Sequence, residues 1–322
     1  MPKIEIRSWI ILSTPPLTHP GPQNSGVTTG QDQDVTQHPA QSDPEYTTPG
    51  RSRGMLSAFQ YRYVLSLLMR KGVTTRYYGS ALGWAWSYIR PVAQFLMYYV
   101  VIGILLGVNR GVEYFPVYLF SGLIMINLFS EVFRTTTDAV VSNKALVRKV
   151  YLPRELFPLA AAGGAIVHFL PQAGVLLVIV IFMGWTVTWL QIAALLVAVG
   201  IVAVFGLGMG LMFGALNVAY RDAHNIVDLI LMYTTWASPV IYVFTMVQDR
   251  VPTWLFHLYM SNPVTSAVEL SHTVFWDPIA TDPPRPELLW WYALIGVVLA
   301  LIAIVVGQIV FRRMEGRFAQ DL

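Results

Sequence analysis

The sequence predicts an all-α integral membrane protein with six transmembrane helices. Of its 322 residues, 55% are hydrophobic and only 12% are charged, whereas a soluble domain carries about 25% charged residues. A stretch of about 20 apolar residues crosses a bilayer as a helix, because lipid offers the backbone no hydrogen-bond partners. Six such stretches occur, at about 91–109, 114–133, 158–184, 189–216, 226–247 and 288–311.

The basic residues predict how these spans are oriented, because Lys and Arg collect on the cytoplasmic side of membrane proteins. From residue 51 onward, sixteen Lys and Arg residues fall on one side of the predicted spans, against only Arg110, Arg250 and Arg285 on the other. This asymmetry predicts that both termini are cytoplasmic. The chain has no cysteine, which excludes disulfides and cysteine metal sites.

The N-terminal region, residues 1–54, is predicted to be a disordered cytoplasmic tail. From residue 13 it is rich in Pro, Gly, Gln, Ser and Thr, and it cannot bury enough apolar surface to fold. Residues 1–12 are too short for a span, and no clear cleavage site follows, so we expect no signal peptide; a start codon set too early is an alternative. The transmembrane domain is expected to occupy residues 55–322.

Residues 55–72 are predicted to form an amphipathic helix before the first span. Leu56, Phe59, Tyr63 and Leu67 recur at spacings of three and four, which places them on one helix face. A basic amphipathic helix beside a span usually lies in the membrane interface. Arg62, Arg70 and Lys71 would then reach phosphate headgroups. A plain juxtamembrane anchor fits this pattern equally well.

A second short helix is predicted over residues 143–152, between spans two and three. It begins at a candidate cap, Asn143, and ends before Pro153. Its apolar face consists of Leu146, Val147, Val150 and Tyr151. An intracellular helix that presents apolar residues beside Lys and Arg suits docking into a partner's groove. A loop that only sets topology is the simpler explanation.

The loop 248–287 contains two apolar pieces that are too short to span, 254–256 and 264–276. Pieces of this length indicate re-entrant or surface-lying helices. They would either close an outer gate or form a packed cap.

The sequence lacks the residues of an energy source. No glycine-rich phosphate-binding loop precedes any lysine, and no metal-binding cluster of His, Asp and Glu is evident. Ion-driven carriers keep ionisable residues within their spans, and here Asp228 is almost the only candidate. We therefore expect no catalytic residue, metal or cofactor in this chain, and energy supplied by another protein.

Aromatic residues recur at helical spacing in three of the predicted spans. They are Phe95, Tyr98 and Tyr99 in the first, Phe129 and Phe133 in the second, and Tyr233, Trp236 and Tyr242 in the fifth. Aromatic faces stack on sugar rings, which suits a path for a glycan, but they also fill bundle cores and membrane interfaces. Gly206, Gly210 and Gly214 repeat every fourth residue in the fourth span, which predicts close helix packing.

Four groups of residues resemble the permease subunits of type-2 ABC transporters that export polysaccharides, the Wzm-like group that serves O-antigen, teichoic acid and cell-wall galactan. These groups are Arg76-Tyr77, Ser80, Leu82-Gly83, Trp86 and Pro91; Lys149 to Pro158; Asn217 and Tyr220-Arg221-Asp222; and Trp236 to Tyr242 with Asn262-Pro263. Their order and spacing, over residues 55–322, are specific. His272 departs from the basic or tyrosine residue that many relatives place about there.

The resemblance implies a fold of the ABC-2 exporter type and roles for particular residues. Residues 55–72 become an interface helix, with Arg62, Arg70, Arg76, Tyr77, Gly83 and Trp86 at lipid headgroups. Residues 143–152 become the coupling helix that enters a groove on an ABC ATPase. The implied contacts to that ATPase are Lys144, Leu146, Val147, Arg148, Val150, Tyr151, Pro153, Arg154, Glu155, Tyr220, Arg221 and Asp222.

The resemblance also implies the partners. Two copies of this chain would pair with two Wzt-like ATPase subunits, which bind ATP and Mg²⁺, in a bacterial cytoplasmic membrane. The cargo would be a lipid-pyrophosphate-linked glycan, and the long tail suggests actinobacterial galactan exporters. The alternatives are an ABC-2 permease for a small drug or lipid, a secondary carrier, and a membrane-embedded glycosyltransferase, against which the lack of paired acidic motifs counts. We expect no nucleic-acid partner.

Overall fold

The computed structural model describes residues 55, 59–76, 79–150, 152–220 and 222–318. These residues belong to one compact unit, 47–322, and within them the chain is helical and contains no strand. The predicted tail, 1–54, lies outside the described residues. The long helices are α3 (Trp86–Tyr98), α4 (Phe115–Ser142), α6 (Leu156–Phe182), α7 (Trp189–Ala219) and α12 (Leu289–Met314).

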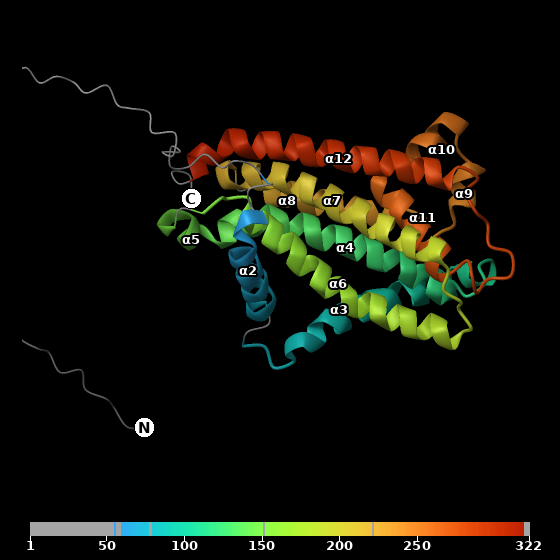
Figure 1. Cartoon of the computed structure of the whole chain (residues 1–322). Helices are drawn as coiled ribbons and strands as arrows, with labels where there is room; N and C mark the ends of the chain where they lie inside the picture. Colours follow the sequence, from blue (N-terminus) through green and yellow to red (C-terminus); the bar gives the residue numbers. More distant parts are fainter. Residues whose placement is uncertain (1–54, 56–58, 77–78, 151, 221, 319–322) are drawn as a thin grey trace, which may run out of the picture. The chain divides into compact units, whose positions relative to one another are not determined.

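The shorter elements flank these helices. They are α2 (Arg62–Thr75), α5 (Lys144–Lys149), α8 (Ala223–Trp236), α9 (Phe244–Gln248), α10 (Thr253–Met260) and α11 (Pro263–Phe275). Single turns are η1 (Phe59–Tyr61), η2 (Gly83–Ala85), η4 (Val108–Arg110) and η5 (Glu315–Arg317), and α3 continues as the π-helical segment η3 (Tyr99–Leu105). Helices α4, α6, α7 and α12 run side by side, with α5 at one end and α10 at the other (Figure 1).

Helix α4 is the centre of the packing, since it contacts α6, α7, α8 and α11. Of its most apolar window, 72% is buried, against 6% for the span that contains α3. Helix α7 approaches α4 closely because glycines face it: a methyl group on Gly210 would lie 2.5 Å from Thr136 Cβ. On the other side, Gly208 lies against Gly307 of α12. The predicted role of the glycine repeat in helix packing is confirmed.

Within the part of the chain that the structure describes, five helices are long and apolar enough to cross a membrane, namely residues 86–105, 115–142, 156–182, 189–219 and 289–317. The third, fourth and sixth predicted spans match their positions closely. The first begins earlier than predicted, at Trp86, and holds Pro91 inside the helix. The second extends to Ser142 rather than ending at 133, because Arg134 and Asp138 find polar partners on neighbouring segments.

The prediction of one continuous helix over 226–247 is wrong. Helix α8 has 14 residues, which at 1.5 Å per residue is about 21 Å and shorter than a hydrocarbon core of about 30 Å. The chain leaves the helix at Ala237, before Pro239, which lacks a backbone donor. The buried hydroxyl of Tyr118 lies within hydrogen-bond distance of two carbonyls of this non-helical backbone, Pro239 O at 2.8 Å and Tyr242 O at 2.9 Å, and its single proton is shared between them.

The two short apolar pieces of the predicted outer loop are helical, as α10 and α11. Every residue of α11 except Thr273 is buried, and the helix packs against α4, α7 and α12. Asn262 caps its first turn by accepting from the Val264 amide at 3.1 Å. This burial fits a packed cap better than a freely hinged gate.

The described part of the amphipathic helix consists of η1 and α2, and it ends at Thr75, later than the predicted residue 72. Its side toward α6 consists of the half-buried Val64, Leu65, Leu68 and Met69. The predicted apolar face points elsewhere: Tyr63 is 77% exposed and Leu67 is 56% exposed. Leu56 and the side chain of Phe59 lie outside what the structure describes. Exposed aromatic and aliphatic side chains on a basic helix suit contact with lipid.

Candidate functional site

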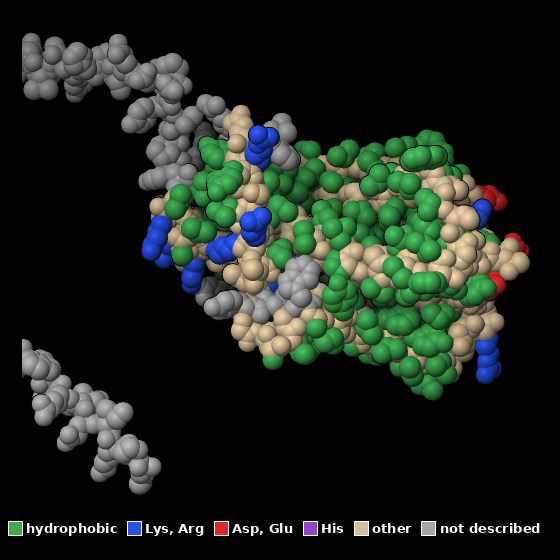
Figure 2. Space-filling view, turned by 60° about the horizontal axis from the view of Figure 1, so that its bottom comes forward, with side chains coloured by type: hydrophobic (Ala, Val, Ile, Leu, Met, Phe, Trp, Pro, Cys, Tyr) green, Lys and Arg blue, Asp and Glu red, His purple; other side chains and the backbone are tan. Residues whose placement is uncertain are grey.

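The end of the bundle that carries α5 is strongly basic. On the face shown in Figure 2, Lys and Arg gather at this end, and acidic side chains appear at the opposite end. Helix α5 follows directly from α4 and exposes Lys144, Ala145, Arg148 and Lys149. This charge distribution agrees with the asymmetry seen in the sequence.

Helix α5 ends at Lys149, earlier than the predicted 152, and Val150 is extended and exposed. Asn143 occupies the cap position, but its side chain does not cap the helix; its amide donates to Ala139 O at 2.8 Å. Val147 is buried and Leu146 is half-buried. The predicted apolar docking face is therefore partly used to hold α5 on the bundle, and what remains exposed is chiefly basic.

The segment after α5 is more buried than a surface that docks a partner would be. Glu155 is fully buried, and it accepts from Gln308 Nε2 of α12 at 3.0 Å. The Arg154 guanidinium lies 5.7 Å from the centre of the Phe318 ring. Pro153 is half-buried, and Tyr151 lies outside the described residues. Arg154 and Glu155 thus tie this segment to the C-terminal part of the chain.

The turn between α7 and α8 presents the second group of predicted contacts. Tyr220 is 68% exposed and Asp222 is also exposed, whereas Arg221 lies outside the described residues. The turn leads directly into α8, whose first residues contact α4 and α7. A partner that displaced this turn would therefore act directly on α8.

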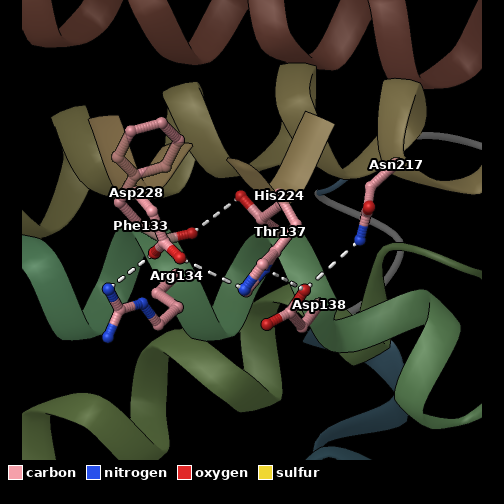
Figure 3. Close-up of polar contacts among 7 residues, drawn as sticks. All are labelled: Phe133, Arg134, Thr137, Asp138, Asn217, His224 and Asp228. Atoms are coloured by element: carbon pink, nitrogen blue, oxygen red, sulfur yellow. Dashed lines mark hydrogen bonds and ion pairs between the residues drawn. The ribbon is translucent and has the colours of Figure 1, made fainter. Parts of the chain in front are cut away.

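A polar network, the Asp228 cluster, joins α8 to α4 and α7 just beyond this turn (Figure 3). Arg134 of α4 donates to Asp228 Oδ1 at 2.6 Å. His224 lies between two carboxylates, with Nδ1 3.2 Å from Asp138 Oδ1 and Nε2 3.5 Å from Asp228 Oδ2. Asn217 of α7 donates to Asp138 at 3.3 Å. Asp228 is therefore paired within the protein.

A second ionisable residue lies in a predicted span and was missed by the sequence reasoning. Glu131 of α4 forms a two-pronged ion pair with Arg76, which precedes the first span. Its position within the apolar stretch 114–133 is a signal that sequence alone offers, because charges inside spans are costly and usually functional. The hydrogen bonds and ion pairs of Arg134, Asp138, Asn217 and His224 were not predicted either, since their partners are distant in sequence.

A cavity of about 780 Å³, lined by both polar and apolar side chains, opens between α2, α3, α4 and α6. Its charged lining residues are Lys71, Arg76, Arg90, Glu131, Arg134 and Asp138. Ser87 and His168, whose side chains lie 3.4 Å apart, line it as well. A concave site with converging polar groups is the default place for a ligand.

The predicted headgroup residues divide between this cavity and the surface. Arg76 and the half-buried Trp86 line the cavity, while Arg62 and Arg70 are exposed on α2. Gly83 has φ of +48°, a backbone conformation that favours glycine and turns the chain into the first span. Tyr77 lies outside the described residues.

The predicted path residues differ in burial: some are buried, some are exposed and the others are half-buried. Phe129 and Phe133 are buried between α4 and α7, where they pack against Phe205 and Phe213, a position that does not fit a path along the protein surface. Tyr233 and Trp236 are 65% and 55% exposed on α8.

The four other predicted path residues are half-buried: Phe95, Tyr98 and Tyr99 of the first span, and Tyr242. Phe95 stacks on Tyr99 with ring centres 5.9 Å apart, and Tyr98 lies beside them on α3. The Tyr242 hydroxyl donates to Trp236 O at 2.8 Å.

Comparison with known proteins identifies the family. The family described as ABC-2 type transporter matches residues 63–276. The O-antigen export system permease protein RfbA of Myxococcus xanthus is 26% identical over 264 residues, which cover 82% of this chain and 97% of that protein. A protein of the same name from Klebsiella pneumoniae is 25% identical, over 80% of this chain and 95% of its own length.

A third relative is the polysialic acid transport protein KpsM of Escherichia coli, 22% identical over 67% of this chain and 82% of that protein. The family match covers well over half of the chain, and it includes most of α2, all of α5, the Asp228 cluster and the cavity. The chain therefore belongs to the ABC-2 type transporter family.

Proposed function

We propose that this chain is the membrane subunit of an ATP-driven ABC exporter that moves a lipid-linked polysaccharide across the cytoplasmic membrane. The observation that carries the proposal is the match, over nearly their whole length, to permeases named for O-antigen export. The cargo is a glycan on a lipid pyrophosphate, such as O-antigen or cell-wall galactan. ATP and Mg²⁺ bind to a separate ABC ATPase subunit, and this chain contributes no catalytic residue.

The α5 end is the surface that meets the ATPase. Exposed Lys144, Arg148 and Lys149 on α5 lie at the same end of the bundle as the exposed turn at Tyr220 and Asp222 (Figure 1). Basic residues favour the cytoplasmic side of a membrane, which is also where ATP is available. Both termini are then cytoplasmic, and the sixth crossing is made by α8 together with the non-helical segment 237–243.

Two copies of the chain, with two ATPase subunits, form the working transporter. The exposed Tyr233 and Trp236, together with the half-buried Tyr98, line a path between the copies, where their rings stack on sugars. This assignment draws support from the exposure of α3 and α8 compared with the buried α4. Closed twofold assembly is the commonest arrangement of identical subunits.

The first experiment is to purify the tagged full-length chain in mild detergent and identify the proteins that accompany it. We expect an ABC ATPase in about equal amount, and ATP-dependent export after reconstitution. A chain that is purified alone and transports without ATP would contradict the proposal.

A charge reversal then tests the contact surface. The double variant Arg148→Glu and Lys149→Glu should weaken ATPase association about tenfold or more, because like charges facing each other cost several kcal/mol. Arg110→Glu is the matched control, since Arg110 is an exposed arginine in η4, before α4, and far in sequence from α5. Equal loss in both variants would mean that α5 is not the contact.

A further inference from the structure

We propose that the cavity between α2, α3, α4 and α6 is a binding site for a lipid-borne diphosphate, held by Lys71 and Arg90. This inference deepens the proposed function and rests on it. It differs from the expectation that Arg62, Arg70 and Arg76 lie at lipid headgroups, because the charges of the cavity favour Lys71 and Arg90 as the residues that hold the diphosphate.

Most charges in the cavity already have partners. Arg76 is paired with Glu131, Arg134 with Asp228, and Asp138 with His224 and Asn217. Their charges are largely balanced within the protein, and an incoming anion would have to displace a carboxylate to use them.

Lys71 and Arg90 differ from the other cations of the cavity. Among the described residues neither has an acidic partner within ion-pair distance. Lys71 Nζ donates to the neutral Asn143 Oδ1 at 3.2 Å, which leaves it further donor capacity. The Arg90 guanidinium lies 5.7 Å from the centre of the Trp86 ring, a contact that leaves its edge N–H groups available. Two cations on different helices of one cavity suit a ligand with two adjacent negative groups.

The remaining lining of the cavity suits a hydrated head group. Gln94, Asn127, Ser130 and Gln172 contribute amides and a hydroxyl. The volume of about 780 Å³ falls within the range of ligand sites, and exceeds what a single phosphate would fill. A diphosphate with its first sugar is a better match in size and polarity.

The surroundings of the cavity indicate that the anion carries an apolar chain. Helix α3 forms one side of the cavity, and it exposes Ile89, Val92, Leu96 and Met97. Such a helix can cover an acyl or prenyl chain while the cavity holds the head group. Arg62 and Arg70 are exposed on α2 and do not line the cavity, so they lack this arrangement.

The test is ligand binding to the purified full-length chain in uncharged phosphatidylcholine nanodiscs, followed by native mass spectrometry. The probes are a polyprenyl diphosphate, phosphatidylglycerol and inorganic pyrophosphate. Lys71→Ala with Arg90→Ala should weaken polyprenyl diphosphate binding roughly tenfold to hundredfold for each cation, the worth of a hydrogen bond to a charged group. Arg62→Ala with Arg70→Ala, the matched control, should bind as the unaltered protein does.

Two further measurements keep the result interpretable. Lys71→Arg with Arg90→Lys keeps both charges and should retain most of the binding, which separates loss of charge from loss of folding. Co-purification of the ATPase should be unchanged in the Lys71→Ala with Arg90→Ala variant. A chain that binds no ATPase even without substitutions would contradict the proposed function, and this result is distinct from a loss of diphosphate binding.

The three probes also distinguish which anion the cavity binds: a diphosphate lipid, a bulk anionic lipid or free pyrophosphate. An equal loss for phosphatidylglycerol would support the site and assign it to bulk anionic lipid, whereas binding of inorganic pyrophosphate alone would overturn the need for a lipid chain. Unchanged binding of the diphosphate lipid in the alanine pair, or an equal loss in the matched control, would overturn the inference.

Discussion

Two polar clusters of the bundle differ in how deeply they are buried. The Asp228 cluster joins α8 to α4 and α7, and the side chains of its ion pairs are 35% to 51% exposed. The second, the His272 cluster, consists of Tyr118, Glu269 and His272, where the His272 and Glu269 side chains are 2% and 5% exposed. Tyr118 stacks on His272 with ring centres 3.9 Å apart.

The difference indicates which polar contacts between helices can be broken at a low cost in free energy. An exposed ion pair contributes about 0 to 1 kcal/mol, because water replaces each partner readily. A buried polar group that loses its partner costs about 1 to 3 kcal/mol. We therefore expect α8 to be the element that shifts when the turn at Tyr220 and Asp222 moves, while α11 stays locked against α4.

The largest effect should follow from removing the centre of the His272 cluster. Tyr118→Ala deletes a fully buried ring and the hydroxyl that donates to the non-helical segment 237–243. Truncation of a buried aromatic residue costs about 3 to 5 kcal/mol. We expect a clear fall in the thermal midpoint of the detergent-solubilised protein. Tyr233→Ala is the control, because Tyr233 is 65% exposed. Similar midpoints for the two variants would contradict the expectation that the His272 cluster holds α11 firmly against α4.

A smaller effect, which depends on pH, is expected beside this cluster at Asp277. Burial raises the pKa of Asp277, and the hydrogen bond and charge of Arg285, at 2.8 Å, oppose the rise. A carboxyl whose folded-state pKa lies above its unfolded value binds protons more tightly when folded. Stability should therefore fall as pH rises from the ordinary carboxyl range through the raised pKa, and level off above it.

Two variants test this dependence. Asp277→Asn should remove this part of the pH dependence of the thermal midpoint. Arg285→Ala should enlarge it and extend it to higher pH, since it leaves a buried carboxylate without its partner, at about 1 to 3 kcal/mol. A pH profile that is identical in all three proteins would mean that Asp277 does not titrate between the folded and unfolded states.

Most of the helical architecture could be predicted from the sequence, because lipid leaves a backbone few alternatives to helices of about 20 apolar residues. The failure over 226–247 has a local cause. Hydropathy does not register that the Tyr118 hydroxyl lies within hydrogen-bond distance of two carbonyls of an interrupted helix. The same applies to the end of α4, where Arg134 and Asp138 lie beyond the apolar stretch and bind partners far away in sequence.

The candidate site was predictable in part. The basic end and the exposed residues of α5 follow from charge alone, whereas the burial of Leu146, Val147 and Glu155 depends on which face of a short segment meets the bundle. The role assigned to Arg76 changed for a similar reason, since its partner Glu131 belongs to a different span. Pairing between distant segments is the information that a single sequence lacks.

The smallest effect on stability is expected in the Asp228 cluster. Asp228→Asn removes the charge that faces Arg134 and His224, and both Arg134 and Asp228 are about half exposed, so the thermal midpoint should change by little, about 0 to 1 kcal/mol. ATP-dependent export should fall only in part, because the variant alters the position of α8 and removes no coupling ion. The double exchange Arg134→Asp with Asp228→Arg should restore export toward the unaltered level.

The same pair of variants distinguishes the exporter from a secondary carrier. In a carrier that binds its coupling ion at Asp228, the loss of that carboxylate abolishes transport, and an arginine in its place cannot restore it. In the proposed exporter, the restored ion pair holds α8 again, because the attraction does not depend on which helix carries which charge. If Asp228→Asn abolished transport and the double variant Arg134→Asp with Asp228→Arg did not restore it, two conclusions would be contradicted. These are the role of the Asp228–Arg134 ion pair in holding α8 and the assignment of the chain to an ATP-driven exporter.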